Sequence, residues 1–282
     1  MQGIRLIHPP ATTSRRTALP PMSWLETISG PNVMAPTIVA VFLLAGLVKG
    51  VVGLGLPTIS MALLALMMSP AEAAALLVVP SLVTNVWQLR PWSTLGPMLR
   101  RLGPMQMGVC VGTVVGAWTL GAPAGAWAMA SLGAALVLYA VWALVGARFS
   151  VGPATERWLG PVVGAVTGLV TAATGVFVIP AVPYLQALGL KRDGLIQAMG
   201  ISFTVSTLAL AVGLYFNARY SGAALGTSIL MLLPAVGGMY AGEVLRRRLS
   251  AELFRRFFFG GLMVLGAYMV AKEIIAHTSA LS

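Results

Sequence analysis

Charged residues are scarce in this chain of 282 residues. Only 9% are Asp, Glu, Lys or Arg, against about 25% in soluble globular proteins, while 58% are hydrophobic. A soluble domain of this length needs a polar shell that so few charges cannot supply. The sequence therefore excludes a water-soluble fold and predicts an all-α, polytopic integral membrane protein whose solvent is the lipid bilayer.

Cysteine and histidine are scarcer still. Cys110 is the single cysteine, and the two histidines, His8 and His277, lie near opposite ends of the chain. One cysteine cannot form an intrachain disulfide, and zinc, haem or Cys/His catalysis needs ligands or bases that are missing here. The sequence also lacks Gly-x-Ser-x-Gly and the nucleotide-binding Gly-x-x-x-x-Gly-Lys-Ser/Thr motif. We therefore expect no metal, no cofactor, no enzymatic activity and no use of ATP by this chain.

The net charge is strongly positive, with 18 Lys and Arg against 7 Asp and Glu. In a soluble domain, a charge of +11 would suggest binding to nucleic acid. Here the basic residues lie singly or in short clusters between apolar stretches, which is typical of the cytoplasmic connections of a membrane protein. We expect this charge to face the anionic leaflet and predict no nucleic-acid partner.

Eight apolar runs follow an irregular, proline-rich N-terminal tail of residues 1–35. No apolar run of signal-peptide length follows Arg15 and Arg16, so the tail does not resemble a secretory signal, and Met22 is an alternative start. Six of the eight runs have the length of a single membrane span. The runs cover residues 36–69, 71–89, 104–121, 124–147, 159–190, 195–217, 222–244 and 257–275.

The first and fifth runs are too long to cross a membrane once as straight helices. Each would measure about 50 Å, against a hydrocarbon core of about 30 Å. Glycine and proline, which weaken helices, are frequent in both runs. We expect each run to break at these residues, the first between Gly50 and Pro57 and the fifth somewhere among its glycines and prolines from Gly160 to Pro180.

The two long runs also resemble each other. Gly46 and Gly50 match Gly164 and Gly168 at an offset of 118 residues, and the segments after the breaks match at an offset of about 122. We therefore predict two repeated halves, 36–147 and 159–275. Residues 148–158 would connect them, and residues 276–282 would form a C-terminal tail.

Charge placement favours an inverted repeat. If each long run crosses the membrane once, ten basic residues lie on one side and seven on the other. If each long run returns to the side on which it began, as a re-entrant hairpin or as two short spans, the division becomes twelve against five. The second division obeys the positive-inside rule and gives the two halves opposite orientations.

The glycine-rich start of each half resembles the TauE/SafE family of sulfite and organosulfonate exporters. The resemblance covers most of the chain after residue 36 and is carried by residues 46–57, 80–88 and 164–180. It implies a multi-pass carrier in the bacterial inner membrane that moves small sulfur-containing or carboxylate anions. Residues 171–176 depart from the family pattern, which shows a denser glycine cluster, and this departure bears on the substrate more than on the fold.

Lys49 is the basic residue that lies deepest within an apolar run. An ammonium at the bilayer centre costs roughly 3 kcal/mol on insertion scales, so such a residue usually faces a partner, a cavity or water. A bound anion would supply the partner, and the N-terminus of a half-helix beginning near Thr58 would support it. The alternative is that Lys49 extends to the lipid headgroups or bonds a backbone carbonyl.

Neutral hydrogen-bond donors at matching positions of the two halves could complete an anion site. Hydroxyl groups in membrane helices also commonly bond their own backbone, so each has a structural alternative. The predicted substrate-binding residues are Lys49, Gly50, Gly53, Gly55, Thr58, Thr84, Asn85, Thr171, Thr174, Gly175, Ser206 and Thr207.

The acidic residues Glu72 and Asp193 fit helix capping better than proton transfer. Ser69-Pro70-Ala71-Glu72 has the form of a capping box with proline at the first helical position, and Asp193 lies at the corresponding place of the second half.

The sequence thus predicts a secondary transporter for small anions, with export suggested by the family resemblance. The alternative is a non-transporting membrane subunit that binds partner proteins through its helices. The substrate, the coupling ion and the oligomeric state stay open.

Overall fold

A computed structural model of the chain describes residues 31–146, 149–219, 222–246, 248 and 251–281. These residues form ten α-helices and one short 3₁₀ turn, η1 (Trp92–Thr94). The helices are α2 (Pro31–Val52), α3 (Leu56–Leu64), α4 (Pro70–Trp87), α5 (Leu95–Leu120), α6 (Gly125–Val145), α7 (Pro153–Thr174), α8 (Ala181–Ala187), α9 (Arg192–Phe216), α10 (Gly222–Leu245) and α11 (Ala251–Leu281).

Six of these helices are long and apolar enough to cross a membrane: α2, α4, α6, α9, α10 and α11. The prediction of an all-α, polytopic membrane protein is confirmed. Ten helices replace the eight apolar runs because the first and fifth runs each form two helices.

Both predicted helix breaks are present. In the first, α2 ends at Val52 and α3 begins at Leu56, with Gly55 at φ 112° as the N-cap of α3. In the second, α7 ends at Thr174, and Gly175 at φ 70° closes it before α8 begins. Positive φ favours glycine in both places, since other residues lose energy in this conformation.

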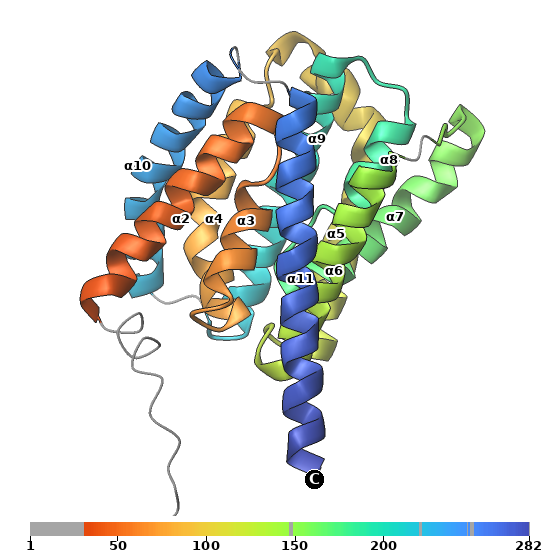
Figure 1. The fold of residues 1–282 in the computed structure, drawn as a ribbon. Helices are drawn as coiled ribbons and strands as arrows, with labels where there is room; N and C mark the ends of the chain where they lie inside the picture. Colours follow the sequence, from red (N-terminus) through yellow and green to blue (C-terminus); the bar gives the residue numbers. More distant parts are fainter. Residues whose placement is uncertain (1–30, 147–148, 220–221, 247, 249–250, 282) are drawn as a thin grey trace, which may run out of the picture.

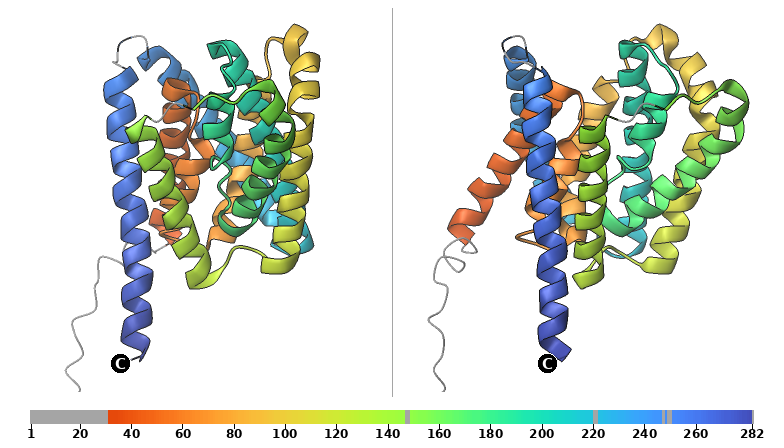
Figure 2. Two further views of the ribbon diagram at one scale, coloured as in Figure 1. Left: turned by 90° about the vertical axis from the view of Figure 1, so that its right-hand side faces the viewer. Right: turned by 45° about the vertical axis from the view of Figure 1, so that its right-hand side comes forward.

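The five helices α2–α6 and the five helices α7–α11 run in opposite directions (Figures 1 and 2). In Figure 1, α2 rises from the lower end of the bundle, α3 returns to that end, and α4, α5 and α6 then alternate up, down and up. The second set begins with α7 at the upper end, and α8 returns there before α9, α10 and α11 run down, up and down. Each broken element thus returns to the end of the bundle where it began.

Close glycine contacts join the two sets in matching ways. A Cβ added to Gly46 of α2 would lie 2.1 Å from the Ala235 carbonyl oxygen of α10. A Cβ added to its counterpart Gly164 of α7 would lie 2.0 Å from the Met105 carbonyl oxygen of α5. The first helix of each set therefore packs closely against the fourth helix of the other set, as small-residue faces allow in membranes.

The last helices of the two sets, α6 and α11, cross each other at glycines. A Cβ on Gly133 would lie 2.8 Å from the Gly266 carbonyl oxygen, and one on Gly266 would lie 2.7 Å from that of Gly133. This reciprocal contact is the one expected where a local two-fold axis passes between equivalent helices.

Pro80 interrupts the backbone hydrogen bonds inside α4, and the Ser228 side chain of α10 supplies hydrogen bonds at this place. Proline has no N–H to donate to the carbonyl four residues earlier, which is that of Leu76. The Ser228 hydroxyl donates to this Leu76 oxygen at 2.7 Å and accepts from the Val79 N–H at 3.1 Å. Ser228 is fully buried, so it fixes α10 against α4 from inside the bundle.

Some predicted boundaries shift. Of the predicted tail 1–35, residues 1–30 lie outside the described residues, and α2 already begins at Pro31. The helix α7 begins at Pro153, within the segment 148–158 expected to connect the halves, and α11 continues through 276–281, where we expected a tail. The C-terminal end of α11 projects below the other helices (Figure 2).

The predicted capping box at the start of α4 is confirmed. The Ser69 hydroxyl accepts from the Glu72 N–H at 3.3 Å, and the Glu72 carboxylate accepts from the Ser69 N–H at 2.9 Å. Asp193 lies in the first turn of α9, where its charge suits the positive end of the helix. No side-chain cap bond forms there.

Candidate functional site

Lys49 lies inside the protein, with 3% of its surface exposed. Its amine donates to the Thr84 hydroxyl at 3.0 Å and to the side-chain oxygen of Asn85. Both partners are neutral and belong to α4, and among the described residues no carboxylate pairs with this amine. The partners of the amine in the described part of the chain are therefore side chains of α4 and not backbone carbonyl oxygens.

Lys49 lies in the last turn of α2, and Thr84 and Asn85 lie in the last turn of α4. Both helices end at the upper end of the bundle (Figure 1). The break after α2 therefore places the three residues near the same end of their two helices.

Several buried polar groups on Asn85 and on the helices α3, α4 and α9 have no hydrogen-bond partner. The Asn85 amide nitrogen and the Ser81 hydroxyl on α4, the Thr58 hydroxyl on α3 and the Ser206 hydroxyl on α9 are of this kind. Buried polar groups are nearly always paired, so unpaired groups call for a missing partner such as water or an ion. All four can donate a hydrogen bond, and their helices pack against one another, α3 on α4 and α4 on α9.

The first break is held in place by α4. The Gln88 amide donates to the Gly53 carbonyl oxygen at 2.8 Å, and the Gly53 N–H donates to the Lys49 carbonyl oxygen at 2.7 Å. Beyond the break, α3 begins at Leu56 without a side-chain cap. The first N–H groups of a helix lack intrahelical acceptors, so the start of α3 adds unpaired donors near Thr58.

The predicted glycines have different roles. Gly53 at φ 83° and Gly55 shape the break. Gly50 instead packs against α10, where an added Cβ would lie 2.1 Å from the Met239 carbonyl oxygen. Gly50 therefore allows close packing of α2 against α10.

In the second half, most of the predicted binding residues form hydrogen bonds within their own helices. The hydroxyls of Thr171, Thr174 and Thr207 donate to carbonyl oxygens of Thr167, Val170 and Phe203 in their own helices. This is the structural alternative expected for hydroxyl groups in membrane helices. Gly175 closes α7. Only Ser206, with its unpaired hydroxyl, repeats the pattern of the first half.

A cavity of about 520 Å³ opens near the upper end of the bundle, and sequence reasoning missed it. Its lining includes the side chains of Arg192, Arg246 and Arg255, which come from the start of α9, the end of α10 and α11. Val52 and Leu54 of the first break also line it. From the sequence, the arginines near helix ends predict only membrane orientation. The fold brings Arg192, Arg246 and Arg255 together at one cavity.

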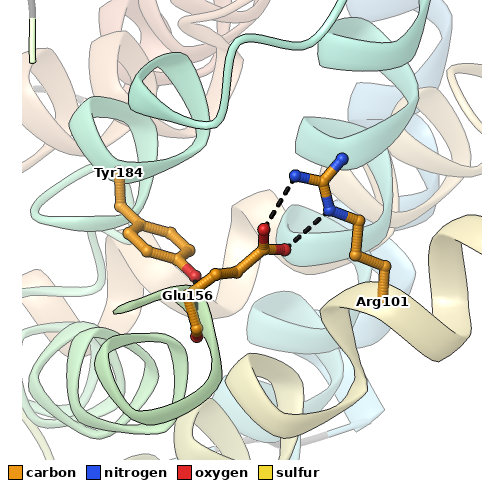
Figure 3. Close-up of polar contacts among 3 residues, drawn as sticks. All are labelled: Arg101, Glu156 and Tyr184. Carbon is orange, nitrogen blue, oxygen red and sulfur yellow. Dashed lines mark hydrogen bonds and ion pairs between the residues drawn. The ribbon is translucent and has the colours of Figure 1, made fainter. Parts of the chain in front are cut away.

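An ion pair links α5 and α7. The Arg101 guanidinium of α5 donates to both carboxylate oxygens of Glu156 in α7, at 2.7 and 2.8 Å (Figure 3). The Tyr184 hydroxyl of α8 donates to the Glu156 carbonyl oxygen at 3.4 Å. The pair therefore joins α5, α7 and α8 at one point.

A comparison with known protein families gives one match. The family described as sulfite exporter TauE/SafE matches residues 38–269. Searches among curated proteins and among solved structures found no significant match. The matched range includes both breaks and Lys49, and the family description supports a membrane transporter of sulfur compounds. Because the match covers most of the sequence, the chain belongs to the TauE/SafE sulfite exporter family.

Proposed function

We propose that this protein is a secondary transporter that exports small anions, such as sulfite, organosulfonates or related carboxylates, across the bacterial inner membrane, and that it is not an enzyme. One observation carries the proposal: a buried ammonium group without a carboxylate partner bonds the side chain of Asn85, whose own amide donor is unpaired. An isolated buried charge is costly, and an anion bound at this place would neutralise it.

Most of the proposed binding residues offer charge or a free donor, whereas the Thr84 hydroxyl, which donates to the Pro80 carbonyl oxygen at 2.6 Å, holds the Lys49 amine in place. We propose Lys49, Asn85 and Thr84 as the centre of the site, with Thr58 and Ser206 completing it from α3 and α9. Sulfite and sulfonate oxygens accept several hydrogen bonds, and these groups supply donors from three helices around one cation.

The two halves, 36–147 and 159–275, are proposed to be inverted repeats that move against each other. The opposite helix directions and the matching glycine contacts support this. Basic residues also gather at the upper end, which the positive-inside rule assigns to the cytoplasm. The described members of this group are Arg90, Arg100, Arg101, Arg157, Lys191, Arg192, Arg246, Arg248, Arg255 and Arg256, while Arg148 and Arg247 lie outside the described residues.

Transport by purified protein in proteoliposomes tests the proposal. Wild-type protein should move labelled sulfite or a sulfonate without any partner protein, and Lys49→Met should lower the rate at least 100-fold. Lys272→Met is the matched control, because Lys272 is exposed on α11 and its loss should leave the rate within twofold.

Wild-type transport by a folded Lys49→Met protein would refute the site. No transport by the wild-type protein alone, under an imposed anion gradient in either direction, would favour the alternative of a subunit that binds partner proteins.

A further inference from the structure

We propose that the cavity at the upper end is a second anion site, an arginine vestibule that captures the free oxyanion before it reaches Lys49. This inference rests on the proposed function. We define the arginine vestibule by Arg192, Arg246, Arg255, Gln186 and Tyr139, all of which line the cavity.

The vestibule has the depth and composition of a binding site. Tyr139 lies six residues before the end of α6, and Met199 lies seven residues after the start of α9. At 1.5 Å per residue, both positions are about 10 Å below the upper ends of their helices. The arginines lie at or near helix ends, so guanidinium groups surround the mouth and Tyr139 lies deeper.

Tyr139 provides an independent sign of a missing ligand. Only 2% of its surface is exposed, and its hydroxyl has no hydrogen-bond partner. Its ring packs edge to face on Phe259 at 5.1 Å between centroids, so the apolar part of the side chain is already satisfied. A buried hydroxyl without a partner is costly. The hydroxyl is closed off from the cavity in this structure, so an oxyanion in the vestibule would accept from it after a small shift of the vestibule wall.

The vestibule lies between the two broken elements. Val52 and Leu54 of the first break line it together with Pro183 of the short helix α8. Lys49 is less than one helical turn before Val52. An anion bound by the arginines would therefore lie next to the first helix break, close to the proposed Lys49 site.

The chemistry of the vestibule favours oxyanions. Guanidinium groups present a planar fork of N–H donors that suits sulfite, sulfonate and phosphate oxygens, and they stay charged at every physiological pH. A phospholipid headgroup offers the same oxyanion chemistry from a different source. The experiment must therefore separate a free anion from a lipid phosphate.

Equilibrium binding of sulfite to the protein in nanodiscs distinguishes a free anion from a lipid phosphate. Trp142 lines the vestibule and stacks on Phe149 at 5.2 Å, so its fluorescence reports on occupancy once the Trp142→Phe signal is subtracted. Sodium sulfite is titrated against chloride at constant ionic strength, in discs of phosphatidylcholine alone and in discs that also contain phosphatidylglycerol.

We expect a saturable change in phosphatidylcholine discs. The half-saturating sulfite concentration should rise at least tenfold in Arg192→Gln/Arg246→Gln and less than twofold in Arg157→Gln. Arg157 is the matched control because it is an exposed arginine in the first turns of α7, at the same end of the bundle, and does not line the vestibule.

Three results would overturn the proposal: no saturable change, an equal shift in Arg157→Gln, or a change that occurs only with phosphatidylglycerol and not with sulfite. The last result would assign the vestibule to a lipid headgroup. This test measures binding and not transport. A negative result here would therefore leave the proposed Lys49 site intact, and a transport result against the Lys49 site would leave the vestibule intact.

Tyr139→Phe gives a second variant that does not depend on charge. It removes one oxygen atom that has no partner in the protein, so the unfolding temperature should not fall. Sulfite half-saturation should rise about threefold to tenfold. An unchanged half-saturating concentration would exclude the hydroxyl from the site.

Discussion

Replacing Asn85 with aspartate would give Lys49 the carboxylate that it lacks. The side-chain oxygen of Asn85 already accepts from the Lys49 amine, so Asn85→Asp places a negative charge at hydrogen-bond distance with almost no change in shape. If an anion normally occupies this place, the new carboxylate competes with it permanently.

The expected effect on transport is large. Two unit charges about 3 Å apart attract each other by roughly 5 kcal/mol at an effective dielectric constant of about 20. Burying the carboxylate offsets part of this, which leaves a net pairing of about 3 kcal/mol. An anion must overcome this pairing to bind, and since about 1.4 kcal/mol corresponds to a factor of ten, transport should fall about 100-fold. The unfolding temperature should stay the same or rise.

Proteoliposome uptake of labelled sulfite and thermal unfolding of the same preparation measure both quantities. Asn217→Asp is the control, since it makes the same chemical change at the far end of α9. It replaces an amide that donates to the Ala117 and Gly213 carbonyl oxygens, so its unfolding temperature should fall, while transport by the folded protein should stay within twofold of wild type. Wild-type transport by Asn85→Asp would refute the reasoning, and so would a loss of transport that comes with unfolding.

Three further predictions concern the packing of the bundle, each measured by thermal unfolding in detergent. Gly238→Ala should destabilise the protein by about 1–3 kcal/mol, because the added Cβ would lie 2.0 Å from a carbonyl oxygen of α2, whereas Gly237→Ala meets nothing within 4 Å and should cost less than about 0.5 kcal/mol. Ser228→Ala should cost about 1–3 kcal/mol because it leaves two backbone groups of α4 unpaired, while Thr227→Ala, whose hydroxyl bonds its own helix, should be nearly neutral. Glu156→Gln should cost less than about 1 kcal/mol, since its guanidinium partner is 41% exposed and well screened by water. These contacts would be contradicted if Gly237→Ala destabilised the protein as much as Gly238→Ala, or Thr227→Ala as much as Ser228→Ala. A loss of more than about 1 kcal/mol in Glu156→Gln would also contradict them.

The helix breaks were predictable because glycine and proline act locally. Gly53, Gly55 and Pro57 weaken the first long run wherever it lies in space, and the excess length over the bilayer is a property of the sequence itself. The grouping of Lys49 with Thr84 and Asn85 followed from the same logic, since the repeat offset placed that pair near the first break.

The sequence indicates that regularly spaced glycines allow close helix contacts, but it does not show which helices they contact. Gly112 and Gly116, spaced four residues apart in the sequence, form a close face against α7, and Gly238 and Gly242 form one against α2. Small-residue spacing shows that a helix can be approached closely, but it does not say which helix approaches. The interlocking of the first helix of each half with the fourth helix of the other half needed the structure.

The arginine vestibule and the Arg101–Glu156 pair were not predictable from one sequence. Their members come from helices far apart along the chain, and an arginine near a helix end has the same sequence signature whether it lines a cavity or faces the headgroups.

Anomalous diffraction from crystals soaked in selenite, a heavier analogue of sulfite, tests the central claim most directly. The account predicts a selenium peak within about 4 Å of the Lys49 amine, with the Asn85 amide nitrogen turned toward it. A fully occupied vestibule with no peak at Lys49, and with the amine still bonded only to Thr84 and Asn85, would contradict the account.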